Sequence, residues 1–223
     1  MVTIRRTLQD KVAPAHTALL LIDMVNDLVD PAGVAALRAG RPIEHARAVI
    51  APQVALLDAA RAAGVLVVYV NHVTLPGRVA ASGPWLEARS RATYSVEETC
   101  LAGSWGARVV AELTPLDGDL TVEKYRYSGF AGTNLDLVLR SAGVETVVCA
   151  GVSTNACVEA TAREAFSHDY YVVYARDACA SWDPALHEAT LATAAHRYAT
   201  VATTAEIGSA FGVADPAVAH GAG

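Results

Sequence analysis

The chain has 223 residues, of which 53% are hydrophobic and only 6% aromatic, and a formal net charge of -6. This length suits a single domain whose interior is built largely from Ala, Val and Leu. A net negative charge without a block of Lys or Arg argues against binding to a phosphate backbone, so we expect no nucleic-acid partner.

The termini and the cysteines indicate where the protein works. No apolar signal-peptide core occurs in the N-terminal sequence MVTIRRTLQDKVAPAH, and no later segment reaches the length of a membrane span. We therefore expect no membrane partner and a cytoplasmic protein. The four cysteines lack CxxC spacing, which favours reduced thiols over disulfides or a zinc site. They are Cys100, Cys149, Cys157 and Cys179.

Apolar runs and helical periodicity predict strands and helices that alternate along the chain. The expected strands are 17–23, 65–71, 119–124, 144–151 and 170–178, with 200–207 as a candidate edge strand. The expected helices are 45–64, 105–113, 134–143, 155–169 and 185–199. Residues 72–104 show little periodicity, and we expect a long excursion that forms part of a binding-site wall.

This alternation predicts βαβ units with right-handed crossovers. We expect an α/β fold: a doubly wound, mainly parallel six-stranded sheet with helices on both faces, in a Rossmann-like three-layer sandwich. One domain should span residues 1–223, with frayed ends at about 1–14 and 212–223. In such sheets ligands bind outside the carboxyl ends of the strands.

Three chemically suited residues are predicted to meet at that edge. Asp23 ends the first strand, Lys124 ends the third, and Cys157 follows the fourth at a helix start. Taken singly, they have ordinary explanations as a turn cap, a solvated cation and a core thiol. Only two of the 17 basic residues are lysines, Lys11 and Lys124, which favours a specific need for an ammonium at the strand end. A helix N-terminus and a nearby ammonium favour a thiolate, so we interpret Cys157 as a nucleophile held anionic.

The residues before Cys157 also suit chemistry. Gly151 allows a tight turn, and Ser153, Thr154 and Asn155 follow it. The backbone N–H groups of this polar run are candidates for an oxyanion hole. An ordinary N-cap made by one of the three side chains is a compatible alternative.

Three segments together resemble the isochorismatase-like cysteine hydrolases. They are LLLIDMVND, VEKYRYSGFAGTNLDLVLRSAG and VVCAGVSTNACVEATAREAFSHDYYVVYARDACA, and the match runs from about residue 17 to 207. The resemblance implies the same doubly wound fold. By position it implies Asp23 as acid/base, Lys124 as charge stabiliser and Cys157 as nucleophile. It also implies a cis peptide between Val152 and Ser153, with the backbone N–H groups of Ser153 and Cys157 forming the oxyanion hole.

The reaction implied is hydrolysis of a small-molecule amide or ureide through a thioester, without a cofactor. The resemblance is greatest to the ureidoacrylate and biuret amidohydrolases, and N-carbamoyl substrates belong to the same branch. Homo-oligomers, dimers or tetramers, are common in the family and are expected here. Candidate substrate-binding residues are Asn71, His72, Trp85, Arg126, Tyr127 and Phe130.

Two departures from the family pattern bear on the substrate. Val25 stands where the first motif usually has a glutamine. The second strand ends at His72 without the carboxylate and second histidine that hold a metal in the family's nicotinamidases, so we expect no metal. A nicotinamidase-like or other carboxamide hydrolase is the alternative enzyme.

Three other classes of protein are weighed against this one. A Rossmann nucleotide binder lacks support because no GxGxxG follows the first strand. A Cys–His hydrolase would need His168, His187 or His196 as its base. A catalytically silent binding module would use the same cleft without turnover.

Overall fold

The computed structural model describes residues 4–38, 40–91 and 99–212. One sheet of six strands, all parallel, has the order β3-β2-β1-β4-β5-β6. The strands are β1 (Thr17–Ile22), β2 (Leu66–His72), β3 (Leu120–Lys124), β4 (Thr146–Val152), β5 (Tyr171–Ala180) and β6 (Ala199–Ala202). This order confirms the predicted doubly wound α/β fold.

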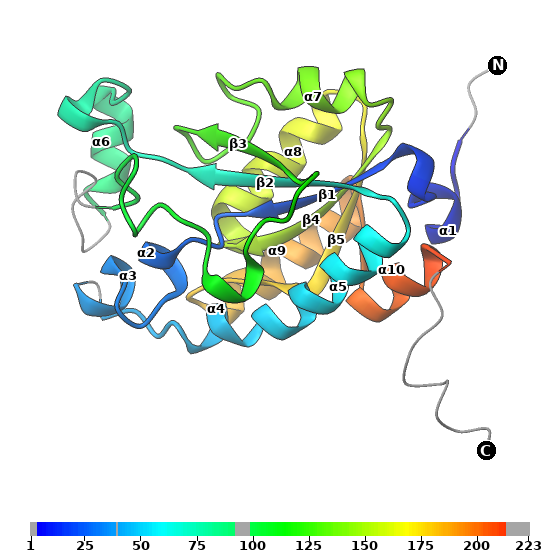
Figure 1. The fold of residues 1–223 in the computed structure, drawn as a ribbon, viewed down its shortest axis with the longest axis horizontal. Helices are drawn as coiled ribbons and strands as arrows, with labels where there is room; N and C mark the ends of the chain where they lie inside the picture. The colour runs from blue at the N-terminus through cyan, green and yellow to red at the C-terminus, as the bar shows by residue number, and fades with distance from the viewer. Residues whose placement is uncertain (1–3, 39, 92–98, 213–223) are drawn as a thin grey trace.

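Two layers of helices cover the sheet, and Figure 1 shows α5 and α10 on one side with α7 and α8 on the other. The first layer contains α4 (Glu44–Ala48), α5 (Ile50–Ala62) and α10 (Thr204–Ala210); the second contains α7 (Leu135–Ser141), α8 (Glu159–Ser167) and α9 (Pro184–Arg197). Side chains of a strand point alternately to the two faces. In β1, Leu19 and Leu21 accordingly join the first core, whereas Leu20 and Ile22 join the second.

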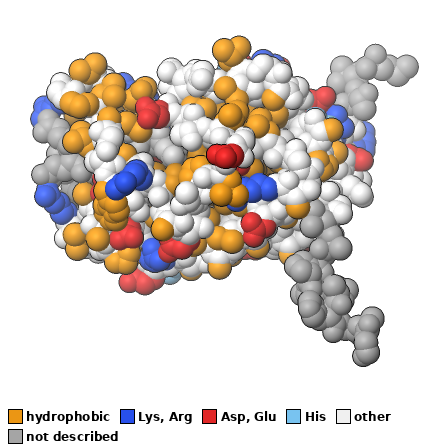
Figure 2. Space-filling model, in the orientation of Figure 1, with side chains coloured by type: hydrophobic (Ala, Val, Ile, Leu, Met, Phe, Trp, Pro, Cys, Tyr) orange, Lys and Arg blue, Asp and Glu red, His pale blue; other side chains and the backbone are white. Residues whose placement is uncertain are grey.

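Shorter elements complete the described chain. The short helices are α1 (Leu8–Lys11), α2 (Asn26–Val29), α3 (Val34–Leu37) and α6 (Gly83–Arg89), with 3₁₀ turns at Pro14–His16, Pro76–Arg78 and Ala111–Leu113 and a π-helical turn at Thr154–Val158. In the described residues, no helix is long and apolar enough to cross a membrane. On the face shown in Figure 2, basic and acidic side chains are interspersed among apolar ones.

From residue 5 onward, the N-terminal segment, which we expected to be frayed, contacts the rest of the domain. Arg5 forms an ion pair of 2.7 Å with Glu145, and Lys11 Nζ donates a hydrogen bond of 2.8 Å to Thr200. At the other end, residues 213–223 of the segment expected to fray lie outside the described residues.

The prediction of a helix at 105–113 is wrong, because the backbone N–H and C=O groups of that segment form hydrogen bonds with the loop after β1. Val25 forms an isolated antiparallel bridge with Val109, the Asn26 N–H donates to Arg108 O at 2.9 Å, and the Val110 N–H donates to Met24 O at 3.0 Å. These hydrogen bonds replace the helical ones, and a single 3₁₀ turn remains at Ala111–Leu113.

The candidate edge strand at 200–207 is half correct. Strand β6 stops at Ala202, and α10 begins at Thr204. Thr203 and Glu206 form a capping box, in which the Glu206 carboxylate accepts from the Thr203 N–H at 2.7 Å. This motif is a strong helix-start signal, and it ends the strand.

Candidate active site

The carboxyl ends of β1, β3 and β4 bring together Asp23, Lys124 and Cys157, which we call the strand-end group. Asp23 directly follows β1, Lys124 is the last residue of β3, and Cys157 lies in the π-helical turn after β4. β2 lies between β1 and β3 in the sheet, so the long Lys124 side chain reaches across it. This is the edge where a parallel sheet places its ligands.

Asp23 and Lys124 form a fully buried ion pair. Lys124 Nζ lies 2.8 Å from Asp23 Oδ2. The Lys124 side chain is 0% exposed and the Asp23 side chain is 1% exposed. The backbone N–H of His72 donates to the other carboxylate oxygen at 2.6 Å, and Lys124 Nζ also donates to Arg126 O at 3.2 Å. Burial alone would lower the pKa of Lys124, but the charges of Asp23 and Cys157 outweigh it and raise that pKa.

The backbone before Cys157 is shaped by Gly151 and by a cis peptide between Val152 and Ser153. Gly151 has a φ of 126°, and a Cβ there would lie 2.0 Å from Ile22 O in β1. A glycine is required at this position because it lets β4 approach β1 just before Asp23. The turn that carries Cys157 is thereby held beside the Asp23–Lys124 pair.

The polar side chains of the Cys157 turn bond to one another and to neighbours. Ser153 makes no side-chain cap; its hydroxyl donates to Asn155 Oδ1 at 2.6 Å, and that oxygen also accepts from Ser181 at 2.7 Å. Thr154 Oγ1 lies 2.8 Å from Nδ1 of His187 on α9. These contacts fix the turn from outside and differ from an ordinary N-cap.

The Cys157 thiol interacts with both members of the buried pair. Burial, followed by the negative charge of Asp23, raises the pKa of this thiol to about 12, although Lys124 acts in the opposite direction. This direction favours the protonated thiol over the resting thiolate that we expected, because desolvation and the carboxylate outweigh the ammonium.

Cys157 opens onto a cavity of about 380 Å³ that also contains Asp23 and Ser153 in its lining. The other three cysteines are buried, and burial is the first cause that raises the pKa of each of their thiols. Cys157 is the one described cysteine that combines partial exposure with a place in this cavity.

Three of the six predicted substrate-binding residues line the cavity, and we call His72, Trp85 and Tyr127 the aromatic wall. The Trp85 ring centroid lies 5.7 Å from that of His72 and 5.0 Å from that of Tyr127. Trp85 reaches the cavity from α6, a helix that the sequence pattern did not indicate within the excursion.

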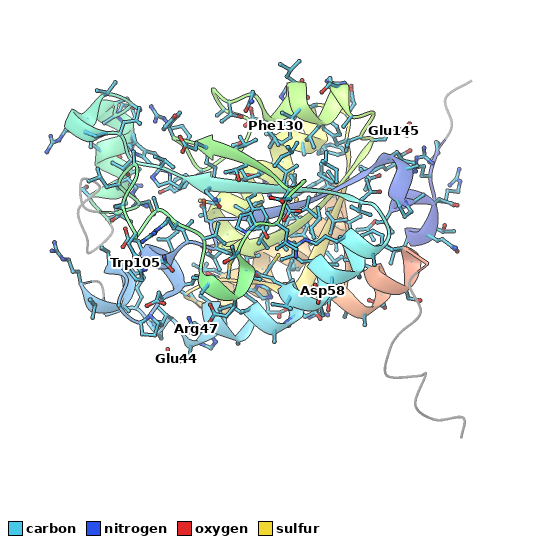
Figure 3. The ribbon with its side chains drawn as sticks, viewed as in Figure 1. Glu44, Arg47, Asp58, Trp105, Phe130 and Glu145 are labelled. Carbon is cyan, nitrogen blue, oxygen red and sulfur yellow. The ribbon has the colours of Figure 1, made fainter. Side chains whose placement is uncertain are left out.

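The other three candidates are not among the residues that line this cavity. Asn71 is buried in β2, and Arg126 lies behind Trp85, with its guanidinium 5.4 Å from that ring and donating to Ala80 O at 2.9 Å. Phe130 packs in the core near α7 and α8, 5.2 Å from the His168 ring, and Figure 3 labels it there.

Several lining residues were not predicted. Arg41 and Trp182 lie in the cavity wall, with the guanidinium 5.5 Å from the ring, and Arg89 lies similarly 5.6 Å from Trp85. Ser181 and Trp182 directly follow β5 at its carboxyl end. The rule that residues at the carboxyl ends of strands form the site, which identified Asp23 and Lys124, would also have identified Ser181 and Trp182. Arg41 does not follow a strand, so this rule does not predict it.

The histidines needed for a Cys–His hydrolase lie elsewhere. His168 stacks on Phe130, His187 is bonded to Thr154, and His196 is exposed on α9. None of the three is in the described lining of the Cys157 cavity. In the part of the chain that the structure describes, no group of three or more His, Cys, Asp and Glu side chains could hold a metal ion.

Residues 17–206 match the model of the Isochorismatase domain family. The chain belongs to the isochorismatase family. Over 210 residues it is 37% identical to the ureidoacrylate amidohydrolase RutB of Methylobacterium radiotolerans, covering 90% of this chain and 81% of that protein. A cysteine hydrolase from Pseudomonas syringae pv. phaseolicola superposes with a TM-score of 0.81 at 29% identity, covering 91% and 95% of the two chains. The N-carbamoylsarcosine amidase of Thermoplasma acidophilum gives a TM-score of 0.69 at 31% identity, with 85% and 96% covered.

Proposed function

We propose that this family member is a cysteine-dependent amidohydrolase that cleaves a C–N bond of a small amide or ureide through a thioester. The observation that carries the proposal is the position of the Cys157 thiol in a cavity beside the buried Asp23–Lys124 pair. A protonated thiol, a carboxylate and an ammonium are the groups that nucleophilic acyl transfer needs. The hydrolases among the relatives support the same conclusion.

In the acylation step, Asp23 accepts the thiol proton as sulfur attacks the substrate carbonyl. The S–C bond forms, and the tetrahedral intermediate then loses its C–N bond while Asp23 returns the proton to the departing nitrogen. Lys124 is held against Asp23 at 2.8 Å and keeps a positive charge beside the sulfur throughout. When Asp23 carries the proton, it is neutral and no longer offsets the ammonium charge. Lys124 can then stabilise a buried anion on sulfur.

We assign the oxyanion hole to the backbone N–H groups of Ser153 and Cys157. The turn that contains them begins at the cis peptide and is fixed by the Ser153–Asn155 and Thr154–His187 contacts. Donors that are already in place stabilise a developing oxyanion without reorganisation. Water then attacks the thioester, its proton passes through Asp23 to sulfur, and the acid product leaves.

The charge of the cavity favours a ureide that bears a carboxylate. The guanidinium groups of Arg41 and Arg89 both line it, and the Asp23 carboxylate is paired with Lys124. Ureidoacrylate and the N-carbamoyl amino acids carry such a carboxylate, but biuret and nicotinamide do not. We therefore rank the acidic ureides first as substrates, with His72, Trp85 and Tyr127 as contacts.

A product-release screen tests this function. Ureidoacrylate, N-carbamoyl amino acids, biuret, nicotinamide and simple amides are incubated with the protein, and released ammonia or amine is measured. We expect turnover of an acidic ureide, its loss in Cys157→Ala, and its retention in Cys149→Ala, whose thiol is buried in the core. Turnover that survives Cys157→Ala would contradict the mechanism.

The same screen distinguishes the alternatives. Preferred release of ammonia from nicotinamide would identify a carboxamide hydrolase instead. A silent binding module would release nothing, and its Cys157 would react with iodoacetamide no faster than Cys149 in the native protein.

We also propose that the protein works as a homo-oligomer. Several large apolar side chains are exposed on the helices, including Leu137 at 70% and Phe166 at 51%. Exposed apolar side chains favour association when they cluster at one surface. Sedimentation equilibrium should give a dimer or tetramer, and a monomer at micromolar concentration would contradict this.

A further inference from the structure

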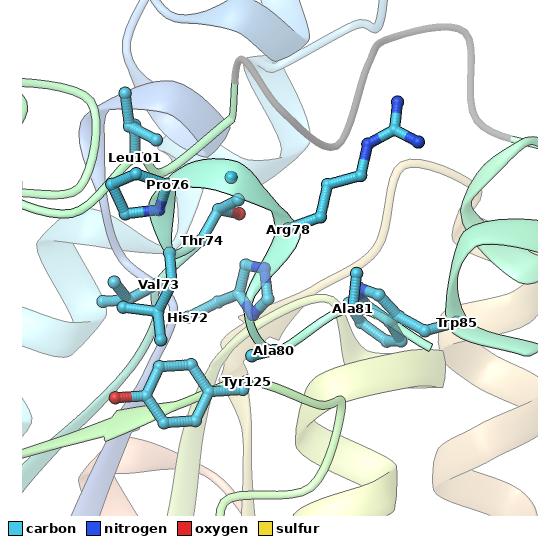
Figure 4. A pocket seen from close by; sticks show the side chains of 12 residues that line it. His72, Val73, Thr74, Pro76, Arg78, Ala80, Ala81, Trp85, Leu101 and Tyr125 are labelled. Carbon is cyan, nitrogen blue, oxygen red and sulfur yellow. The ribbon is translucent and has the colours of Figure 1, made fainter. Parts of the chain in front are cut away.

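A second cavity, of about 110 Å³, is lined in part by His72 and Trp85 of the aromatic wall (Figure 4). His72 and Trp85 line both cavities, so their side chains form the partition between them. The rest of the second cavity is formed by the turn after β2 and by neighbouring residues that include Thr74, Ala81 and Tyr125. At its outer side the chain from residue 76 to 79 is exposed.

Two residues that line this small cavity carry buried polar atoms without hydrogen-bond partners. Both ring nitrogens of His72 and Oγ1 of Thr74 are buried and unpaired in the described structure. His72 is only 7% exposed. Leaving such atoms unpaired destabilises a folded protein, so a polar guest is expected beside them.

The size and chemistry of the cavity fit water. One water molecule needs only about 10–15 Å³ of space that its centre can occupy, so a cavity of about 110 Å³ in this measure has room for several. Burial, followed by the charge of Lys124, lowers the pKa of His72 to about 3. The neutral imidazole has one donor and one acceptor, which allows it to hold water on both of its nitrogens.

The proposed reaction requires water at a particular moment. After acylation, the acyl group occupies part of the main cavity next to Cys157, and the attacking water must be held at a defined position beside the acyl carbon to react quickly. His72 lies beside the reacting groups, since its backbone N–H donates to Asp23 Oδ1 at 2.6 Å. A reservoir behind this residue is close to the carboxylate that would accept a proton from the attacking water.

We propose that the cavity behind His72 and Trp85 stores the water that hydrolyses the thioester, and that His72 is the positioning residue that delivers it. This inference rests on the proposed function. In the step concerned, the water oxygen forms a bond to the acyl carbon, the C–S bond breaks, and the water proton moves through Asp23 to the Cys157 sulfur. Carboxylic acid and free thiol are the products, so no other reactant is needed.

The test separates acylation from hydrolysis with p-nitrophenyl acetate as the probe. This ester acetylates the Cys157 sulfur and releases p-nitrophenol in a burst, and the later steady rate reports hydrolysis of the acetyl thioester. His72→Phe removes both ring nitrogens, and Ala81→Leu fills the cavity without touching His72. Val79→Thr, at an exposed position of 78% beside the cavity, is the matched control.

We expect both His72→Phe and Ala81→Leu to keep the burst and to lower the steady rate by about tenfold to a hundredfold, a range typical of misplaced reacting groups. The acetylated protein should then accumulate in mass spectra. Added hydroxylamine enters through the main cavity and should cleave the thioester of both variants at the wild-type rate. Val79→Thr should behave as wild type.

Wild-type steady rates in both variants would overturn the proposal, as would an equal loss in Val79→Thr. If His72→Phe loses the burst, Ala81→Leu decides alone: a slowed steady rate supports the reservoir and an unchanged one refutes it. Failure of the proposed function is recognised separately, because it would appear as absent ureide turnover in the wild type. The ester probe would still report on water delivery.

Discussion

The strand-end group and the aromatic wall face the same cavity, but they are held in different ways. Asp23 and Lys124 are fully buried, and each polar atom described for them is tied to a neighbour by an ion pair or hydrogen bond. In the wall, His72 is also buried, yet its ring nitrogens lack partners, and Trp85 comes from a short helix outside the sheet. The strand-end group thus has its polar atoms paired, whereas the wall combines the last residue of β2, whose ring is unpaired, with a tryptophan from the excursion.

The largest effect should come from breaking the strand-end group itself. Asp23→Asn or Lys124→Met should lower turnover by about 10²–10⁴-fold, because each removes the proton acceptor or its charge partner. Each should also cost roughly 3–5 kcal/mol of unfolding free energy, since it leaves the partner buried and unpaired. Turnover assays and urea unfolding measure the two quantities.

The double variant Asp23→Asn, Lys124→Met sharpens this prediction. It should recover most of the lost stability but none of the activity, because no buried charge is left alone. Arg163→Gln, in an exposed pair with Glu159, is the control and should change stability by less than about 1 kcal/mol. Full activity in the double variant would remove both residues from the mechanism.

The aromatic wall should respond differently. Trp85→Ala removes a ring whose centroid lies 5.6 Å from the guanidinium carbon of Arg89 and 5.4 Å from that of Arg126. We expect KM to rise by about tenfold to a hundredfold and kcat to fall by a smaller factor, because most of what is lost is uniform binding. Trp105→Ala, whose side chain is 42% exposed and outside the lining, is the control. A loss confined to kcat would place Trp85 in the chemistry and erase the difference between the two regions.

The same difference explains what the sequence alone could predict. Asp23, Lys124 and Cys157 follow strands with clear apolar patterns, and the strand-end rule requires no knowledge of distant contacts. Arg126 and Phe130 lie close to Lys124 in sequence, but their side chains pack behind Trp85 and into the core, which only the tertiary structure decides. The predicted helix at 105–113 failed for the same reason, because the loop after β1 captures its hydrogen bonds.

The last comparison concerns pH, where the two regions should have opposite signs. The folded protein raises the pKa of Cys157 from 9.0 to about 12, so this contribution to stability is intact below pH 9 and is lost as pH rises toward 12. It lowers the pKa of His72 from 6.5 to about 3, so that contribution is intact above pH 6.5 and is lost as pH falls toward 3.

Urea unfolding across pH tests this with one variant from each region. Cys157→Ser should flatten the alkaline decline and leave the acidic one, whereas His72→Phe should do the reverse, each by up to about 1.4 kcal/mol per pH unit for one titrating group. Other ionisable groups shape both declines, so the comparison is between variant and wild type at each pH. If Cys157→Ser left the alkaline slope unchanged, the fold would not raise the pKa of this thiol. A resting thiolate would instead make the stability of the wild type, relative to Cys157→Ser, fall as pH drops below 9.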